Sequence, residues 1–223
     1  MKARLTQIDR GETLKYLQHR GGDIPDDISA DIDRCEAGLI AVVRPRAVWR
    51  FFQLLPDGRL AGTDFRPAGE DIRSFLRGCG SVILMAATLG AESEILLRQT
   101  QLRSLADAVI MDAAASAAIE NVCDNLCADL AEIMAPLCLT DRFSPGYGDM
   151  PLSQQEELCR VLDVGRRIGV NLSESALMIP QKSVTALIGV SERPGAGSRR
   201  GCALCDRFEN CLYRKEGTDC GNP

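Results

Sequence analysis

The residues best suited to bind a small molecule lie in one short run, Arg-Phe-Ser-Pro-Gly-Tyr-Gly-Asp at 142–149. The guanidinium of Arg142 carries a planar set of N–H donors that matches a carboxylate or a phosphate. Tyr147 adds an aromatic face and one hydroxyl, and the pair Pro145-Gly146 allows the backbone to approach a ligand closely. Residue types alone leave two interpretations open: a turn between helices, and a loop that holds a ligand.

A second candidate for chemistry is a cluster of four cysteines near the C-terminus, Cys202, Cys205, Cys211 and Cys220. The Cys-x-x-Cys pair sets two thiolates at one turn, and two further cysteines complete a four-sulfur site that suits zinc or an iron–sulfur cluster. The later spacings match neither a zinc ribbon nor a ferredoxin, so the pattern predicts a metal site without naming the metal. Unligated or redox-active thiols are the alternative.

The composition describes a protein with ample material for a core and a mild negative charge. Hydrophobic residues make up 45% of the 223 residues, and the formal net charge is −5. Nucleic acid is a poor partner for such a chain, because its binding needs a clustered basic face. No run of about 18 apolar residues predicts a membrane span, and the charged N-terminus lacks the apolar core of a signal peptide. We therefore expect a soluble, cytoplasmic protein without nucleic-acid or membrane partners.

Several enzyme classes lack the residues that they need. His19 is the single histidine and lies in a charged N-terminal segment, so a Ser-His-Asp or Cys-His centre is not expected. No glycine-rich nucleotide fingerprint and no P-loop is present. In a reducing cytoplasm disulfides are not expected, and the six cysteines outside the tail are predicted to be small buried hydrophobes. These are Cys35, Cys79, Cys123, Cys127, Cys138 and Cys159.

The periodicity of the chain predicts an α+β fold, with a mainly antiparallel or mixed twisted sheet and flanking helices. Two short helices are expected within 10–37, and a strand followed by a hairpin within 38–63, where β-branched and aromatic residues concentrate. The continuous apolar run 81–90 is typical of a strand buried on both faces. Residues 92–134 predict either two helices that meet near Ser104 or one bent helix.

The segments around the glycine-containing loop carry boundary signals. The small residues of 112–120 allow another backbone to pack closely, with a shallow floor beneath a ligand as the alternative. Ser153 and Glu156 have the spacing of a capping box that begins a helix, and Gly169 can end that helix in a left-handed conformation. Two strands are then expected between residues 175 and 191.

Composition divides the chain into three parts. Residues 1–191 are expected to form the folded domain, and the Pro/Gly/Ser-rich stretch 192–201 a flexible linker. Residues 202–223 form the cysteine-rich tail. Arginine and lysine residues make this tail locally basic, which is typical of a solvated surface or of a docking site for an acidic partner.

Four motifs occur in order in the second half of the chain: RFSPGYGD at 142–149, IGV at 168–170, LSES at 172–175 and MIPQKSV at 178–184. Together they resemble the activation domain of cobalamin (vitamin B12)-dependent methionine synthase, whose signature is R-x-[SA]-P-G-Y, I-G-V/M-x-L-T/S-E-S and M-x-P-x-x-S-V. The resemblance extends over roughly residues 84–190. We expect a standalone protein, because the substrate, folate and cobalamin domains of the synthase are absent from the chain.

The resemblance implies a specific activity. In that family the domain binds S-adenosylmethionine and stacks over the cobalamin-binding domain, where the donor remethylates the cobalt after a reductase has delivered an electron. A standalone version is expected to reactivate a methionine synthase or related corrinoid protein in trans, as a component of methyltransferase activity. Cobalamin is then carried by the partner, and a flavodoxin-like reductant is a further expected partner.

The resemblance also implies roles for individual residues. Arg142 is expected to grip the carboxylate of the donor, and Tyr147 to lie along the binding groove. Ser144 and Gly146 are expected to supply backbone contacts. The full set of cofactor-binding residues implied in this way is Arg142, Ser144, Pro145, Gly146, Tyr147, Glu174 and Ser183. No catalytic acid or base is assigned, because methyl transfer asks mainly for positioning.

One position departs from the pattern of the family. In the full-length synthase an acidic residue on the helix before the loop helps to fix the donor, whereas the matching position here is Ser116, with Glu120 one turn further on. This departure and the cysteine tail favour an alternative function. The alternative is a metal-bearing electron-transfer or adaptor protein for a corrinoid methyltransferase that does not use S-adenosylmethionine.

Overall fold

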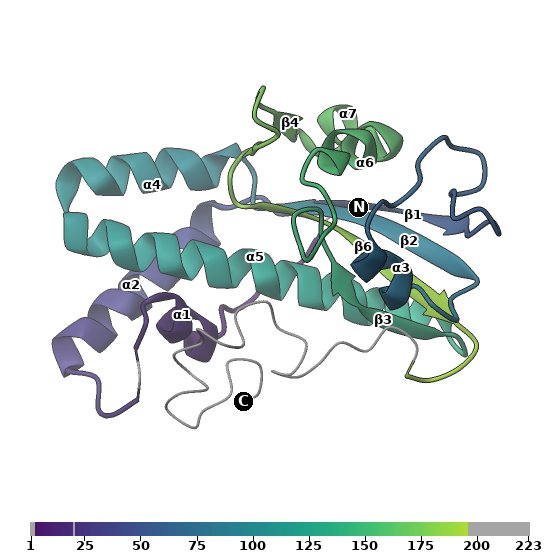
Figure 1. Ribbon diagram of the computed structural model, residues 1–223. Coiled ribbons are helices and arrows are strands. Elements are labelled where there is room, and N and C mark those ends of the chain that lie inside the picture. Colours follow the sequence, from purple (N-terminus) through teal and green to yellow (C-terminus); the bar gives the residue numbers. More distant parts are fainter. Residues whose placement is uncertain (1–2, 20, 196–223) are drawn as a thin grey trace.

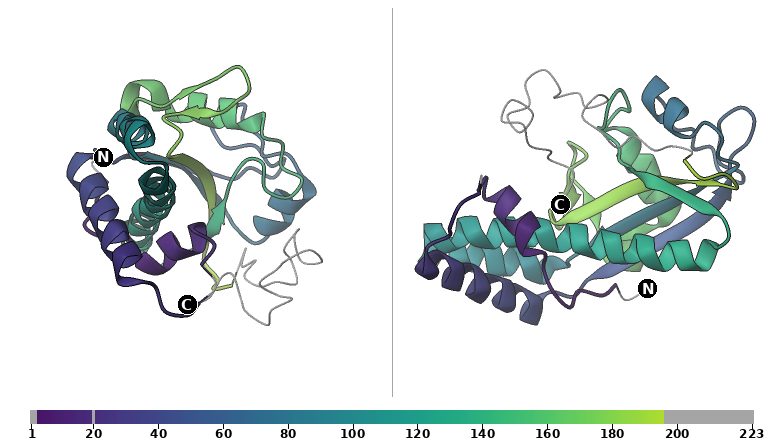
Figure 2. Two further views of the ribbon diagram at one scale, coloured as in Figure 1. Left: turned by 90° about the vertical axis from the view of Figure 1, so that its left-hand side faces the viewer. Right: turned by 90° about the horizontal axis from the view of Figure 1, so that it is seen from below.

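The computed structural model describes residues 3–19 and 21–195 of the chain. Within this part, a four-stranded sheet with the strand order β1-β2-β6-β3 lies between two groups of helices (Figure 1; Figure 2). Neighbouring strands in this sheet are antiparallel throughout. The predicted α+β fold with a mainly antiparallel sheet and flanking helices is therefore confirmed.

The elements alternate between helices and strands along the chain. The helices are α1 (Arg10–Tyr16), α2 (Asp26–Val42), α3 (Glu70–Phe75), α4 (Ala91–Arg103), α5 (Leu105–Met134), α6 (Gln154–Leu162) and α7 (Val164–Ile168). The strands are β1 (Arg46–Gln53), β2 (Ser81–Thr88), β3 (Cys138–Phe143), β4 (Asn171–Leu172), β5 (Met178–Ile179) and β6 (Ser183–Ser191). β4 and β5 pair only with each other and form a small hairpin.

The two central strands, β2 and β6, carry the apolar interior of the sheet. β2 is buried along nearly its whole length, which confirms the prediction of a strand covered on both faces. Along β6, Ala186 and Ile188 belong to one hydrophobic cluster and Leu187 to the other, because successive side chains on a strand point to opposite faces. The sheet thus separates two cores.

One face of the sheet is covered by α1, α2, α4 and α5 (Figure 2). α5 runs along this face, and several of its alanines are fully buried: Ala114, Ala115, Ala117 and Ala118. Small side chains let the helix approach its neighbours closely, which supports the close-packing interpretation of residues 112–120. Among the described residues, none of the helices is long and apolar enough to cross a membrane.

α2 extends to Val42, so the prediction of strand structure from residue 38 onward is wrong at its start. Ile32, Cys35 and Leu39 are buried at spacings of three and four residues, which is the pattern of one helical face. The helical spacing of these buried residues outweighs the strand preference of the β-branched residues near the end of the segment. The strand itself, β1, begins at Arg46.

The opposite face of the sheet is covered by α3, α6 and α7, which enclose the second core. Phe75 of α3 packs against Phe143 of β3, with ring centroids 5.1 Å apart. This contact lies directly beneath the segment that follows β3. The second core therefore supports the candidate binding loop from below.

α4 and α5 are separate helices that meet at Ser104, as one of the two sequence predictions states. Ser104 has an extended backbone, and its side chain accepts a hydrogen bond from the Asp107 N–H. The residue therefore acts as the N-cap of α5 and satisfies one of the backbone donors left free at the helix start.

The segment 142–155 differs from its prediction in two places. Arg142 and Phe143 belong to β3, so the guanidinium projects from the sheet edge and not from a loop. Ser153 has a helical backbone and its side chain makes no capping hydrogen bond, so the predicted capping box is wrong. The first N–H groups of α6 are instead satisfied by the backbone carbonyls of residues 151–153.

The helix expected to end at Gly169 is divided into α6 and α7. Asp163 adopts a left-handed conformation with φ 54° and separates the two helices. Gly169 closes α7 with φ 76°, a conformation that glycine adopts without the steric penalty of a side chain. The predicted glycine cap is confirmed.

The cysteines within the described residues are unpaired thiols. Cys35, Cys79, Cys123 and Cys159 are buried, and Cys127 and Cys138 are partly buried. Burial raises the pKa of the Cys127 thiol to about 12 and that of Cys159 to about 11. These thiols are therefore protonated and unreactive near neutral pH, as expected for small hydrophobes.

Candidate functional site

Four residues spaced four apart form a stripe along α5, here called the α5 stripe: Asp112, Ser116, Glu120 and Asp124. Residues at this spacing lie above one another on the same side of a helix. Two cations from the sheet side contact the stripe. Arg142 contacts its C-terminal half and Lys182 its N-terminal half.

Arg142 is held between β3 and α5. Its Nη2 lies 2.7 Å from Glu120 Oε2 and 3.0 Å from Asp124 Oδ1, and 21% of its side chain is exposed. Its Nη1 is buried without a hydrogen-bond partner among the described residues. An unsatisfied buried donor costs about 1–3 kcal/mol, so Nη1 is the donor of this guanidinium that the contacts with α5 leave unused.

Lys182 precedes β6 and contacts the other half of the stripe. Its Nζ lies 2.8 Å from Asp112 Oδ1 and donates a hydrogen bond to Ser116 Oγ at 2.8 Å. The Ser116 hydroxyl in turn donates to the Asp112 carbonyl oxygen at 3.0 Å. Ser116, the residue that departs from the family pattern, thus serves as a neutral acceptor that helps to hold Lys182 on α5.

The loop after Arg142 closes on itself through backbone hydrogen bonds. The Tyr147 N–H donates to Ser144 O at 3.1 Å, and the Gly146 N–H donates to Met150 O at 2.9 Å. The Tyr147 ring is 59% exposed and lies 6.1 Å from the Phe143 ring between centroids. The loop therefore presents an aromatic ring to solvent, while these two N–H groups are used inside the turn.

Asp149 ties the loop to the start of α3. Its carboxylate accepts hydrogen bonds from the Glu70 N–H at 2.6 Å and the Asp71 N–H at 3.0 Å. The Asp71 carboxylate accepts in return from the Asp149 N–H at 3.2 Å. Gly148 has φ +51°, and a Cβ there would lie 2.2 Å from Asp71 Oδ2. A side chain at this position would displace the Asp71 carboxylate, so glycine keeps the tie between the end of the loop and α3 intact.

Tyr16 of α1 lies close to the Arg142 ion pairs. Burial raises the pKa of its hydroxyl, and the negative charge of Glu120 adds to this effect while Arg142 opposes it. The phenol therefore stays neutral and is a potential hydrogen-bond donor beside the stripe. α1, α5 and β3 thus converge at this position.

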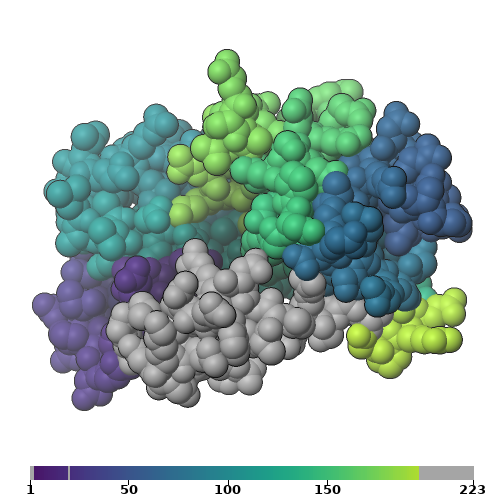
Figure 3. Space-filling view, in the orientation of Figure 1, coloured from purple at the N-terminus to yellow at the C-terminus, as the bar shows by residue number. Residues whose placement is uncertain are grey.

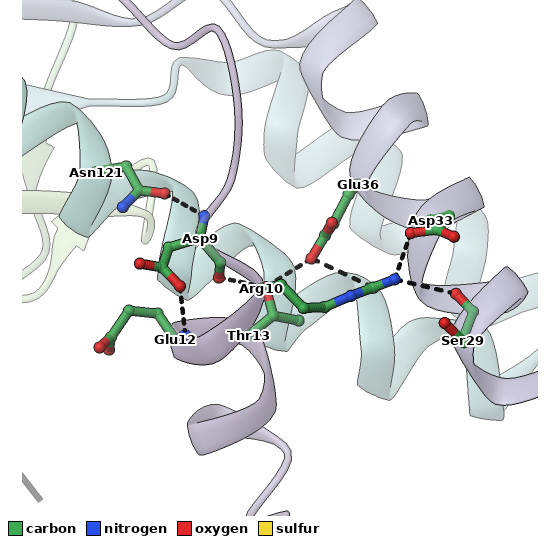
Figure 4. A network of polar contacts seen from close by, with 8 residues as sticks. All are labelled: Asp9, Arg10, Glu12, Thr13, Ser29, Asp33, Glu36 and Asn121. Atoms are coloured by element: carbon green, nitrogen blue, oxygen red, sulfur yellow. Dashed lines mark hydrogen bonds and ion pairs between the residues drawn. The ribbon is translucent and has the colours of Figure 1, made fainter. Parts of the chain in front are cut away.

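Polar contacts fix α1 in this position (Figure 4). Arg10 forms ion pairs with Asp33 and Glu36 of α2. Thr13 donates a hydrogen bond to Glu36 at 2.8 Å. The Asp9 N–H donates to Asn121 Oδ1 of α5 at 2.8 Å. Because α1 is bound to both α2 and α5, Tyr16 is held on the same side of α5 as the stripe.

One family of known proteins has a sequence model that spans most of these features. Residues 100–194 match the family model of the vitamin B12 dependent methionine synthase, activation domain. This range contains the α5 stripe, the Arg142 loop and the segment up to the end of β6. The resemblance to the methionine synthase activation domain is confirmed.

A solved structure has a fold similar to that of this chain. It is described as the crystal structure of the MetH reactivation domain bound to AdoHcy. The TM-score is 0.59, with 17% sequence identity, and the match covers 95% of this chain and 82% of that chain. At this identity the likeness concerns the fold. None of the curated proteins matches the sequence.

Two of the residues expected in the activation-domain site lie apart from Arg142. Ser183 is buried, with its hydroxyl 2.8 Å from Thr88 Oγ1 and 2.7 Å from the Pro180 carbonyl oxygen. It starts β6, whereas Arg142 pairs with Ile188 of the same strand, about 17 Å further along. The structure therefore gives Ser183 bonding partners inside the protein.

Glu174 lies on the exposed tip of the β4–β5 hairpin. Gln155 of α6 fastens this hairpin, because its side-chain amide donates to the Ala176 carbonyl oxygen at 2.6 Å and its oxygen accepts from Thr185 at 3.3 Å. Figure 3 shows the hairpin and the loop after β3 next to each other on one face. The Arg142 side chain contacts α5, whereas Leu172 and Met178 of the hairpin pack against the second core.

The sequence interpretation did not single out Asp124, Tyr16 or the role of Lys182 as a partner of α5. The four-residue spacing of polar residues through the otherwise apolar helix 105–134 is the signal that could have identified the stripe. Tyr16 carries no comparable signal, since only the packing of α1 brings it to the site.

The four cysteines of the predicted metal site, Cys202, Cys205, Cys211 and Cys220, lie outside the described residues. Within residues 3–19 and 21–195, no group of three or more His, Cys, Asp or Glu side chains could hold a metal ion. The metal site therefore stays a prediction from the sequence.

Proposed function

We propose that this chain reactivates a cobalamin-dependent methionine synthase in trans, with S-adenosylmethionine as the methyl donor. The observation that carries the proposal is Arg142, whose side chain is 21% exposed and which follows the α5 stripe at the start of the binding loop. It lies within the segment that matches the activation-domain family. The solved structure with AdoHcy supports the same ligand class for a protein of similar fold.

In this methyl transfer the main contribution of the protein is to position the donor. The donor supplies the methyl group of its sulfonium, the partner carries the cobalamin, and a flavodoxin-like reductant supplies the electron. A guanidinium can hold the carboxylate of the methionine part with two parallel hydrogen bonds. This holds the reactive end of the donor at a fixed distance from the binding loop, which is the main requirement for such a transfer.

The remaining residues of the loop shape the site around Arg142. The exposed ring of Tyr147 provides a flat apolar surface, and Ser144, Pro145 and Gly146 bring the backbone next to it. The N–H groups of Gly146 and Tyr147 are bonded inside the turn. We therefore assign ligand contacts of this loop to its carbonyl groups and side chains. Glu174 is exposed at the tip of the β4–β5 hairpin, and we assign it as a candidate for the ammonium group of the donor.

The experiment is a reactivation assay. A short methionine synthase that lacks its own activation domain is oxidised to the inactive Co(II) state and mixed with this protein, S-adenosylmethionine and a reductant. We expect the absorbance spectrum of methylcobalamin to return. Arg142→Ala should abolish the recovery, whereas the control Arg160→Ala, an exposed arginine paired only with Glu157 among described residues, should preserve it.

Two results would contradict the proposal. The first is that no methylcobalamin forms in the presence of the wild-type protein. The second is that Arg142→Ala and Arg160→Ala support reactivation equally well. Calorimetry with S-adenosylhomocysteine separates donor binding from partner recognition, because a protein that assists the synthase without binding this ligand acts as an adaptor.

A further inference from the structure

Exposed aliphatic residues occur on α4, on the first turns of α5 and on the first turn of α2, and the turn from α4 into α5 lies at one end of the helical layer (Figure 1). We call this group the helical-end patch, and its members are Ile28, Ile95, Leu102, Leu105 and Val109. Leu102 is 90% exposed and Leu105 is 77% exposed. Single exposed leucines are ordinary, but several exposed aliphatic residues around one helix corner favour an interaction surface.

A groove opens next to these residues, between α1, α2 and the start of α5. Its volume is about 770 Å³, and it is lined mainly by aliphatic side chains. Val109 and Ile28 belong both to the groove and to the patch. The α4–α5 corner with Leu102 and Leu105 thus projects beside a depression that could receive a similar corner.

Charges of opposite sign flank the helical-end patch. Arg98 and Arg103 are exposed on the α4 side. Asp23, Asp26 and Asp27 are exposed on the side of the loop before α2 and its first turn. An apolar centre with a basic rim on one side and an acidic rim on the other is complementary to itself after a twofold rotation.

We propose that two copies of this chain associate through the helical-end patch. The Leu102–Leu105 corner of each copy enters the groove of the other, and the arginines of each copy face the aspartates of its partner. The apolar centre supplies the affinity, and the flanking charges fix the orientation. No other class of partner is needed, because the chain itself provides the projection, the groove and both signs of charge.

The proposed interface is remote from the Arg142 site. Leu105 and Glu120 are fifteen residues apart on α5, which is about 22 Å along a helix. Association at this end therefore leaves the α5 stripe and its loop open. The proposal does not depend on the proposed function, and either one can fail without the other.

The first test measures the mass of the full chain by light scattering after size-exclusion chromatography at several concentrations. We expect a dimer for the wild type and a monomer for Leu102→Asp/Leu105→Asp. Ile133→Asp is the matched control, since Ile133 is a 57% exposed aliphatic residue at the other end of α5, and it should remain dimeric. A monomeric wild type, or a dimer that survives the double substitution, overturns the proposal.

The second test exchanges the flanking charges and does not rely on loss of association alone. Arg98→Glu/Arg103→Glu and Asp26→Lys/Asp27→Lys should each weaken the dimer at least ten-fold, because like charges then face each other. An equimolar mixture of the two variants should form a mixed dimer, in which the substituted positions of one copy again face substituted positions of opposite charge on the other. If the mixture stays monomeric, or if both variants dimerise as the wild type does, the proposed contact is wrong.

Discussion

At the scale of single residues, the candidate site is a guanidinium shared between carboxylates of its own chain. Arg142 donates through Nη2 to Glu120 and lies 3.0 Å from Asp124. A donor carboxylate must compete with these groups. Asp124 is the weaker partner, because 66% of its side chain is exposed and water screens exposed ion pairs.

Removing the exposed competitor should therefore strengthen ligand binding. We predict that Asp124→Asn tightens the binding of S-adenosylhomocysteine about five-fold, which corresponds to ~1 kcal/mol. Isothermal titration calorimetry measures the change. Glu132→Gln, which removes an exposed carboxylate two turns further along α5, should leave the affinity unchanged. Weaker binding by Asp124→Asn would show that this carboxylate contacts the ligand or supports Arg142, and would contradict the competition.

A buried thiol provides a second prediction at this scale. Burial raises the pKa of Cys159 from 9.0 to about 11, so the folded protein keeps this proton over a range in which the unfolded chain releases it. The stabilising contribution is complete below pH 9 and is lost as the pH rises to about 11. The slope for one such group is about 1.4 kcal/mol per pH unit.

Urea unfolding at a series of pH values tests this dependence. The difference in unfolding free energy between the wild type and Cys159→Ala should shrink between pH 9 and pH 11. A difference that stays constant over this range would mean that the thiol titrates normally in the folded protein.

At the scale of elements, the binding loop is positioned by α3 rather than by its own turn. Asp149 accepts from two N–H groups at the start of α3, in the manner of a capping residue supplied from a distant part of the chain. Loss of such an acceptor costs about 1–2 kcal/mol. The loop should then move away from α3 and lose its fixed distance to Arg142.

We predict that Asp149→Ala lowers the free energy of unfolding by about 1–2 kcal/mol and also weakens the binding of S-adenosylhomocysteine. Chemical denaturation and calorimetry give the two values. Asp64→Ala, at an exposed position in the turn before α3, serves as the control for removing a surface aspartate. A protein that loses stability but binds the ligand with unchanged affinity would show that the tether does not position the loop.

Particular elements show which parts of the fold and site could be predicted from the sequence. The buried strand β2 and the break at Ser104 follow from local patterns, since an apolar run and a capping serine act within a few residues. The prediction at the end of α2 is wrong because the helical spacing of Ile32, Cys35 and Leu39 outweighs the β-branched residues at the end of that helix. The predicted capping box at Ser153 is wrong because the backbone carbonyls of residues 151–153 accept from the first N–H groups of α6 in place of the serine side chain. The loop motif revealed Arg142, but the pairing of Arg142 with Asp124 depends on how β3 packs against α5.

At the scale of the whole molecule, the functional features lie at separate places. The α5 stripe and the loop occupy the part of α5 near β3, and the helical-end patch lies at the opposite end of the same helix. A dimer formed through that end would leave both candidate sites open. Each could then meet a partner synthase independently, so reactivation per chain should be the same for the dimer and for the Leu102→Asp/Leu105→Asp variant.

The cysteine tail adds a last prediction for the whole molecule. Within the part of the chain that the structure describes, no group of three or more His, Cys, Asp or Glu side chains could hold a metal ion. Metal should therefore bind through the four tail cysteines alone. We predict that anaerobically purified protein contains zinc, or iron with sulfide, and that Cys202→Ser/Cys205→Ser removes it. Elemental analysis and visible absorption identify the metal. Cys159→Ala should retain the full content, and a double variant that binds as much metal as the wild type would exclude the tail as its ligand.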